Sequence, residues 1–270
     1  MGAVFITRAL LGAPYDADAL AWRRAVLAQG GTVSAVQLAR IARLVRALKA
    51  RGVWDRLDRL WIFAAENATQ ALTDLRTRSL ATLSPTPPGF TALRGFIGNG
   101  MSAYVDLGVG ASALTRYTQT AGHVAFYIQQ GDGGTNLWTG ADDSGSGFSS
   151  VVIGGMTTSS DFRLQTSGVG NSMMQGGQSG LHIADRQSST AASWMRNGVD
   201  TDANRTVSSA ASRATSTLTA LARNTSGSYS SFSSSRLSMV SVGGTYGASG
   251  RVAVAVTINA YMASVGANTY

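Results

Sequence analysis

The stretch Ser84-Pro85-Thr86-Pro87-Pro88-Gly89 divides the chain into two parts of different composition. Proline fixes φ at about −65° and biases the residue before it toward extended backbone, so a helix cannot continue through this stretch. Ala, Leu and Arg dominate the residues before it, whereas Gly, Ser and Thr dominate the residues after it. We therefore expect a helical anchoring segment over residues 1–83 and a separate domain over residues 84–270.

Two helix starts can be read in the first part. Asp16 or Asp18 can cap a helix that ends near Gly30. A second helix is predicted to begin at Ser34, which forms a capping box with Gln37. Apolar residues follow with helical spacing at Ile41, Leu44, Val45 and Leu48.

Two further short helices are expected before the prolines, one from Trp54 to about Trp61 and one capped by Asn67 that continues to about Arg76. Aromatic side chains would form the core of a small helical bundle: Trp22, Trp54, Trp61 and Phe63. A bundle of this size is near the limit at which a core becomes marginal.

The second part predicts many short strands separated by Gly-, Ser- and Asn-rich turns. Strands are expected at Gly89–Phe96, Tyr104–Asp106, His123–Gln129, Asn136–Thr139, Ser150–Ile153, Asp161–Gln165, Gly180–Asp185, Ala191–Arg196, Thr217–Arg223 and Arg236–Val242. Asn197-Gly198 tolerates positive φ at both positions and predicts a hairpin. Residues 251–265 fit either a strand or a short helix. Strands with this spacing indicate a sandwich or barrel.

The stretch Gly52–Trp61, followed by residues 67–75, resembles a helical segment of tailed-phage and prophage structural proteins. Phe90–Gly100 with Tyr104–Asp106 resembles the first strands of the concanavalin A-like, or laminin-G-like, jelly roll that follows it there. The last strands and terminal segment of that domain are matched by Leu221–Asn224, Ser238–Gly243 and Ala260–Gly266. The resemblance implies a mainly β chain, an antiparallel jelly-roll β-sandwich preceded by helices, in a tail, fibre or head-spike protein of a virion.

The composition restricts the chemistry that the chain can carry. It has no cysteine, which excludes disulfides and thiolate metal sites. The net charge of +8 permits anionic partners but identifies none. No apolar run approaches the roughly 18 residues that a membrane span needs. We expect no membrane insertion and no cofactor.

Catalytic patterns are weak. Glucanases of the resembled fold use closely spaced Glu residues on one strand, whereas Glu66 is the only Glu and lies in the helical part. A Ser-His-Asp triad would need His123 or His182, and both lie in stretches predicted to be strands. The sequence also has no G-x-S-x-G nucleophile elbow. The aspartates lie mostly beside Gly, Ser or Asn, as turn residues do. We therefore expect the chain not to be an enzyme.

Two binding chemistries remain to be weighed. Asp132, Asp142 and Asp143 lie on neighbouring loops whose oxygens suit Ca²⁺, but their spacing matches no loop motif, so no metal site is predicted and a bound Ca²⁺ stays open. The arginines of residues 35–51 have no interleaved aromatic residues, as a single-strand platform requires. They fit a solvated or protein-docking face better than a nucleic-acid site.

Candidate glycan contacts lie in Gly/Ser-rich surroundings: Trp138, Asp142, Asp143 and Tyr229. Sugar recognition combines an aromatic face with hydrogen-bonding side chains, which this set supplies. We expect a virion protein that binds host surface polysaccharide, forms a homo-oligomer with a trimer as first choice, and contacts other virion proteins through its N-terminal segment, including the apolar residues 1–13. The alternative is a purely architectural virion subunit, in a decoration, collar or baseplate, that binds only other virion proteins.

Overall fold

A computed structural model describes residues 15–131, 137–143, 148–155, 160–167, 172–173, 179–207 and 212–269, with side chains given for only some strand residues between 137 and 206. The helices are α1 (Ala17–Ala28), α2 (Ala35–Ala50), α3 (Ala68–Leu72) and α4 (Gly247–Ser264), and single 3₁₀ turns are η1 (Trp54–Arg56) and η2 (Ala111–Ala113). The apolar residues 1–13 lie outside the described residues.

The described strands form two sheets. The first, here the inner sheet, has the order β13 (Val199–Thr206), β12 (Ala191–Arg196), β11 (Gly180–Arg186), β6 (Gly122–Gln130), β17 (Arg236–Gly243), β4 (Gly95–Ile97) and β3 (Gly89–Thr91), and β1 (Leu57–Ile62) also pairs with β17. The second, here the outer sheet, has the order β10 (Ser172–Met173), β9 (Ser160–Ser167), β8 (Phe148–Gly155), β7 (Leu137–Asp142), β14 (Thr217–Ala220), β5 (Val105–Gly110) and β2 (Thr82–Leu83), while β15 (Arg223–Thr225) pairs with β7 and with β16 (Ser228–Ser230). The printed pairings are antiparallel except β15 with β7. The expected fold class, a mainly β antiparallel sandwich with N-terminal helices, is confirmed.

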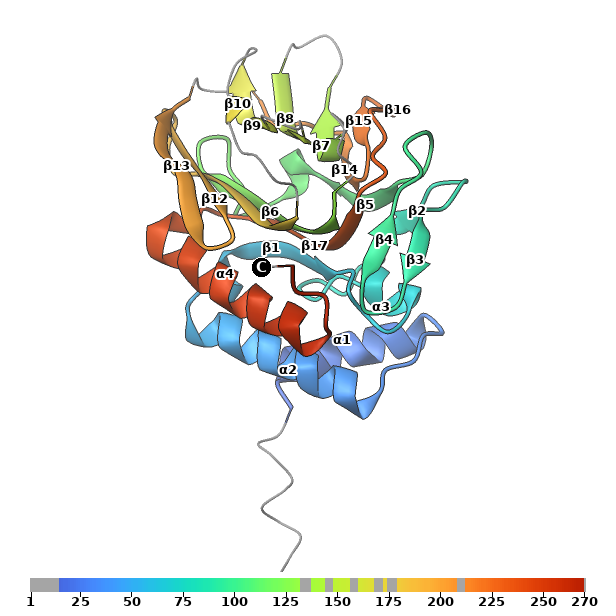
Figure 1. Cartoon of the computed structure of the whole chain (residues 1–270). Coiled ribbons are helices and arrows are strands. Elements are labelled where there is room, and N and C mark those ends of the chain that lie inside the picture. The colour runs from blue at the N-terminus through green and yellow to red at the C-terminus, as the bar shows by residue number, and fades with distance from the viewer. Residues whose placement is uncertain are drawn as a thin grey trace, which may run out of the picture.

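The molecule has three layers, with the helices below the inner sheet and the outer sheet above it (Figure 1). The side chains of strand β6 explain why the inner sheet is covered on both faces. Val124, Phe126 and Ile128 enter the core between the sheets, and Ala125 and Tyr127 enter the core under the helices. Because successive side chains of a strand point to opposite faces, a run that is apolar throughout needs cover on both sides.

Residues 57–62 correct the sequence-based expectation of a helix from Trp54 to Trp61. Only η1 is helical there, and β1 continues as a strand along β17, with Trp61 opposite Val240. Trp61 packs between the sheets, whereas Leu60 and Ile62 pack toward the helices. The ladder with β17 and the burial of both faces outweigh the local helical pattern.

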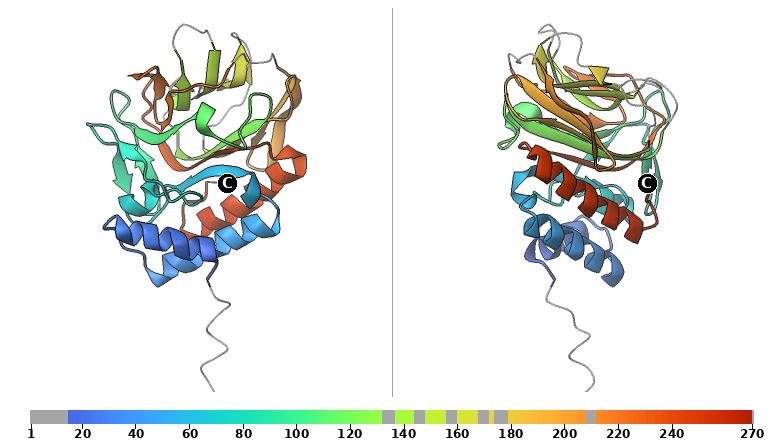
Figure 2. Two further views of the ribbon diagram at one scale, coloured as in Figure 1. Left: turned by 180° about the vertical axis from the view of Figure 1, so that it is seen from behind. Right: turned by 60° about the vertical axis from the view of Figure 1, so that its left-hand side comes forward.

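The proline-rich stretch does not hold the helices away from the sandwich. Strand β1 lies before it in the chain yet belongs to the inner sheet, and the bundle expected from the helices alone is replaced by a core shared with that sheet. Figure 2 shows the helices pressed against the inner sheet from two further directions. The division into residues 1–83 and 84–270 stays a prediction, but the two parts share one sheet.

The cap of α2 is assembled differently from the predicted capping box. Ser34 Oγ accepts a hydrogen bond from the Gln37 amide at 3.0 Å, as expected. The Gln37 side chain instead donates to the Tyr261 hydroxyl at 2.9 Å, and the Glu66 carboxylate accepts from the Ser34 amide at 3.1 Å. Burial alone would raise the pKa of Glu66, but hydrogen bonds from Ser34 and Gln70 hold it below its ordinary value. The only Glu of the chain thus completes a helix cap.

Other local predictions are confirmed. Asp16 caps α1, and Asn67 caps α3, which ends earlier than expected at Leu72. Asn197 and Gly198 have φ of 51° and 82° in the hairpin between β12 and β13. Of the two alternatives for the C-terminal segment, the helix is present as α4.

Helix α4 is attached to the inner sheet by a buried network of charges. Asp185 of β11 accepts hydrogen bonds from the amides of Tyr246 and Gly247, at 3.0 and 2.9 Å, where the helix begins. Arg251 donates to Asp185 at 2.9 Å and to both carboxylate oxygens of Asp200, on β13, at 3.0 and 2.7 Å. Asp185 therefore serves as the cap that the residues of α4 do not supply.

Arg251→Met is expected to lower the free energy of unfolding by about 3–5 kcal/mol, because it leaves the buried Asp185 carboxylate without its cation. Arg24→Met, at an exposed position of α1, is the control and should stay within about 0.5 kcal/mol of the wild type. Urea unfolding monitored by circular dichroism measures both. Equal losses in the two variants would show that the network contributes nothing specific.

His123 is buried beside the start of α4. Its Nδ1 lies 2.6 Å from the Gly244 carbonyl oxygen, which can only accept, so Nδ1 carries a proton. Its ring stacks on Tyr246 with centroids 3.7 Å apart. Burial lowers the pKa of His123 from 6.5 to about 4, and the Gly244 carbonyl and Asp185 oppose the shift only in part. The ring is therefore neutral in the folded protein at neutral pH.

The depressed pKa predicts acid sensitivity. Between pH 6.5 and about 4 the unfolded chain binds a proton at His123 that the folded chain does not, so stability is full above this window and falls as pH falls through it. The loss from this group should approach about 3 kcal/mol. His123→Phe keeps a ring against Tyr246 but cannot titrate, so its unfolding free energy should depend less steeply on pH. Parallel pH profiles for the two proteins would rule this account out.

Candidate functional site

A hollow of about 570 Å³ opens on the outer sheet. It is lined by Asp143, Thr215, Ser216, Thr217, Asn224, Ser226, Gly227 and Tyr229. The lining comes from the end of β7, from β14 and from the hairpin of β15 and β16. These strands lie on the side of the sandwich away from the helices (Figure 1).

Tyr229 forms an aromatic wall of the hollow and is supported from behind the lining by a second tyrosine. Tyr229 of β16 stacks on Tyr104 with ring centroids 4.1 Å apart and planes inclined by 16°, and Phe232 lies 6.3 Å beyond Tyr104. Tyr104 and Tyr229 are both partly exposed. Burial and the neighbouring Tyr104 and Asp106 raise the pKa of Tyr229 to about 12, so its hydroxyl remains a hydrogen-bond donor at neutral pH.

Asp106 of β5 connects this aromatic wall to the polar floor. Its Oδ2 accepts hydrogen bonds from the hydroxyls of Thr217 at 2.9 Å and Tyr229 at 3.3 Å. The Asn224 side chain donates to the Thr217 hydroxyl and carbonyl, both at 3.0 Å. Because each group is held by a second one, the wall and floor are preorganised around a fixed pattern of donors and acceptors.

Asp143 holds the opposite rim. Its carboxylate accepts from the amide and hydroxyl of Thr215 at 2.9 and 3.1 Å, and from those of Ser216 at 3.1 and 2.6 Å. Burial alone would raise the pKa of Asp143, but these hydrogen bonds outweigh it and place the pKa below its ordinary value. A carboxylate has about four lone-pair positions, so Asp143 positions the hydroxyls of Thr215 and Ser216 more than it offers free acceptors of its own.

The hollow brings together two of the four candidate contacts, Asp143 and Tyr229. The side chains of Trp138 and Asp142, on β7, lie outside the described residues. Sequence reasoning missed Tyr104 and Asp106. Their spacing of two residues places both on one face of an extended segment, and this signal could have pointed to them.

The structure also bears on the other chemistries. Within the residues that the structure describes, no group of three or more His, Asp or Glu residues could hold a metal ion. Of the three loop aspartates considered for Ca²⁺, Asp132 and the side chain of Asp142 are not among those residues. No described helix is long and apolar enough to cross a membrane. His123 and His182 are buried, at 0% and 1% exposure, and do not line the hollow.

No family model matches the chain, and a search of curated proteins finds no match either. Among solved structures, the chain is similar to Trypanosoma rangeli sialidase in complex with sialic acid, at 12% identity and a TM-score of 0.52, over 83% of this chain and 40% of that one. It is also similar to the botulinum neurotoxin serotype D binding domain, at 9% identity and a TM-score of 0.53, over 75% of this chain and 52% of that one. The chain spans about two fifths to one half of these structures, and the likeness shows the β-sandwich fold alone.

The similarity to sialidases overturns the expectation that the chain is not an enzyme. That expectation rested on the missing pair of Glu residues. The criterion was too narrow, because sialidases are an exception to the rule of two carboxylates and use a tyrosine nucleophile. The absence of paired Glu residues therefore does not exclude catalysis in a chain of this fold.

The role of Asp143 in the rim can be measured directly. Asp143→Ala removes the acceptor for the Thr215 and Ser216 amides, and hydrogen bonds to a charged group contribute about 1.5–3 kcal/mol. Amide exchange at these two positions should therefore quicken by roughly 10-fold or more. Asp106→Ala is the control, because Asp106 accepts from neither amide. Exchange unchanged in Asp143→Ala would show that the rim is held by other contacts.

Proposed function

We propose that this chain is a glycan-binding component of a bacteriophage or phage-like particle that attaches to polysaccharide on the host surface. The observation that carries the proposal is the hollow on the outer sheet, where Tyr229, stacked on Tyr104, lines the hollow beside a preorganised set of polar groups. A partly exposed aromatic face beside fixed hydrogen-bonding groups is the combination that a sugar ring requires.

The size of the hollow supports a ligand of sugar dimensions. Its volume of about 570 Å³ lies in the range of small-molecule sites, roughly 300–1,000 Å³. Hydroxyls and amides dominate its lining, and Asp143, whose carboxylate lies in that lining, already accepts hydrogen bonds from the protein. Two similar structures also agree with a binding role, since one is a sialidase in complex with sialic acid and the other is named as a toxin binding domain.

Affinity at one such open site would be weak, about 4 kcal/mol or a millimolar Kd. Repetition of the site in a homo-oligomer, with a trimer as the first choice, would raise the avidity by roughly 10² to 10⁴. The net charge of +8 favours an acidic polysaccharide, with binding that weakens as salt rises.

The virion assignment is supported by the resemblance of Gly52–Trp61 and the following strands to tailed-phage structural proteins. In the proposed arrangement the helical end faces other virion proteins and the hollow points outward. The helices and the strands that line the hollow, β14, β15 and β16, lie on opposite sides of the inner sheet, which suits such an arrangement (Figure 1). An architectural subunit that binds only other virion proteins is the alternative, and it predicts no binding to cells.

Tyr229→Ala should abolish binding of the fluorescently labelled oligomer to host cells, because it removes the ring that lines the hollow. Tyr229→Phe is the matched control. It keeps the ring and loses only one hydrogen bond to Asp106, at about 1 kcal/mol, so its binding should fall no more than roughly 10-fold. Flow cytometry of wild-type and capsule-deficient cells measures the difference.

The wild-type oligomer should stain encapsulated cells and not capsule-deficient cells. Equal staining of both strains, or of neither, would remove the glycan-binding proposal. If Tyr229→Ala stained as strongly as the wild type, glycan would bind elsewhere and the assignment of the hollow would be wrong.

A further inference from the structure

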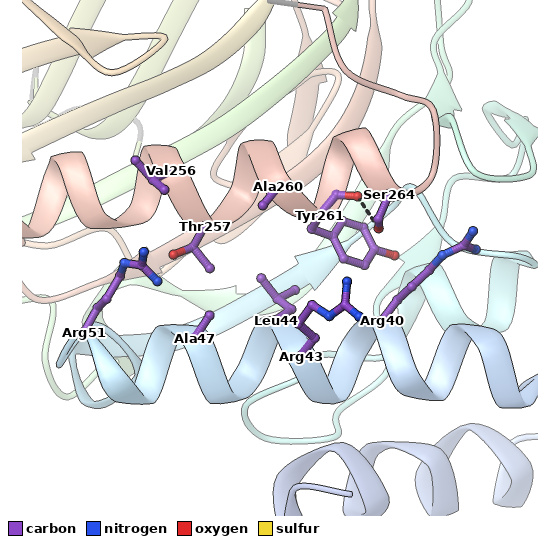
Figure 3. Close-up of a pocket in the computed structure, with 10 residues that line it drawn as sticks. All are labelled: Arg40, Arg43, Leu44, Ala47, Arg51, Val256, Thr257, Ala260, Tyr261 and Ser264. Atoms are coloured by element: carbon purple, nitrogen blue, oxygen red, sulfur yellow. Dashed lines mark hydrogen bonds between the residues drawn. The ribbon is translucent and has the colours of Figure 1, made fainter. Parts of the chain in front are cut away.

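A second concave surface lies at the helical end, between α2 and α4 (Figure 3). This groove has a volume of about 150 Å³. It is lined by Arg40, Arg43, Leu44, Ala47, Arg51, Val256, Thr257, Ala260, Tyr261 and Ser264. The lining is apolar along the floor and basic along the edge that α2 provides.

The charge of the groove is one-sided. Arg40 and Arg51 stand at its two ends with Arg43 between them (Figure 3), and no Asp or Glu lines it. Within the part of the chain that the structure describes, none of the three guanidinium groups takes part in an ion pair or hydrogen bond. Arg40 acts on Glu66 only at longer range, without an ion pair. By contrast, the Lys49 ammonium on the same helix pairs with Asp16 at 2.9 Å. Three cations along one edge are complementary to a partner that brings carboxylates.

The outer face of α4 adds an apolar stripe beside these arginines. Val252 and Val256, one turn apart, are 47% and 52% exposed, and Ala260 continues the row. The only charged residue of α4 is Arg251, which is buried against Asp185. A solvated helix normally presents polar or charged side chains outward, so an exposed face without charge marks an interaction surface.

We infer that this groove binds an acidic amphipathic segment of a partner protein. An apolar side chain of that segment would enter the groove, whose volume is similar to that of a cavity that holds benzene. Carboxylates beside it would meet Arg40, Arg43 and Arg51, since guanidinium pairs with carboxylate in a two-pronged geometry. A helix laid along α2 and α4 would satisfy both requirements at once.

Other occupants fit less well. Phosphates of a nucleic acid need no apolar floor, and the Tyr261 ring is 4% exposed and offers no face for a base. Interfacial membrane helices insert Trp, Phe or Leu, whereas the stripe of α4 consists of Val and Ala. The chain's own residues 1–14 contain Arg8 and no carboxylate side chain. The inference stands apart from glycan binding, because the groove and the hollow share no residue.

The full chain, immobilised, can be used to select binders from a display library of random peptides about as long as the 16-residue α2. Enriched peptides should combine Leu, Ile or Phe at helical spacing with flanking Asp or Glu. Anisotropy of a labelled enriched peptide then gives the Kd. Arg43→Glu should weaken binding at least about 10-fold, a change of about 1.4 kcal/mol, and Arg46→Glu on the same helix should not.

A second pair of variants tests the apolar half. Val256→Asp should weaken peptide binding by a similar factor, while Met101→Asp, at a 75% exposed position between β4 and β5 and outside the groove lining, should leave it unchanged. Enrichment of basic peptides or of none would overturn the inference. So would equal effects of the test and control variants, or tighter binding to a single-stranded oligonucleotide or to phosphatidylglycerol vesicles than to the peptide.

Discussion

An inner sheet with apolar side chains on both faces cannot present either face to water. In β6 and β1, adjacent side chains such as Trp61 and Ile62 enter different cores. The outer sheet must therefore cover one face and the helices the other, and the place of every other element follows from this requirement. The network of Asp185, Arg251 and Asp200 adds direction to this packing. Asp185 accepts hydrogen bonds from the amides where α4 begins, and Arg251 connects the helix to β11 and β13, the strands on either side of β12.

The layered arrangement separates two surfaces of different chemistry. On the outer sheet, carboxylates are used internally, so that Asp143 and Asp106 hold hydroxyls and a tyrosine in place around an open hollow. Between α2 and α4, three arginines that make no ion pair within the described residues border an apolar floor. The first surface suits a ligand rich in hydroxyls, and the second suits a polypeptide with carboxylates. A chain that joins a particle to a cell needs one surface of each kind, which is how the two proposals fit together.

The sequence predicted what depends on near neighbours. The caps at Ser34 and Asn67 and the hairpin at Asn197-Gly198 are short-range signals, and the structure has all three. Prediction from the sequence failed where the pairing strand or hydrogen-bonding residue lies far along the chain. Strand β1 pairs with β17, about 180 residues later in the chain. In the cap of α2, Glu66 takes the place expected for Gln37, because the Gln37 side chain is hydrogen-bonded to the Tyr261 hydroxyl.

The candidate site also combines residues that local sequence indicates with contacts between distant parts of the chain. Asp143 and Tyr229 were found from their surroundings in the sequence, yet the pairing of β14 with both β5 and β7 is what brings Asp106 beside the floor of the hollow. The assignment of this hollow to a sugar can be decided by a crystal structure of the chain with an oligosaccharide prepared from host capsule. We expect a sugar ring against Tyr229, with its hydroxyls bonded to Ser216 and Thr217. A sugar bound at another surface, with the hollow empty, would show that the assignment is wrong.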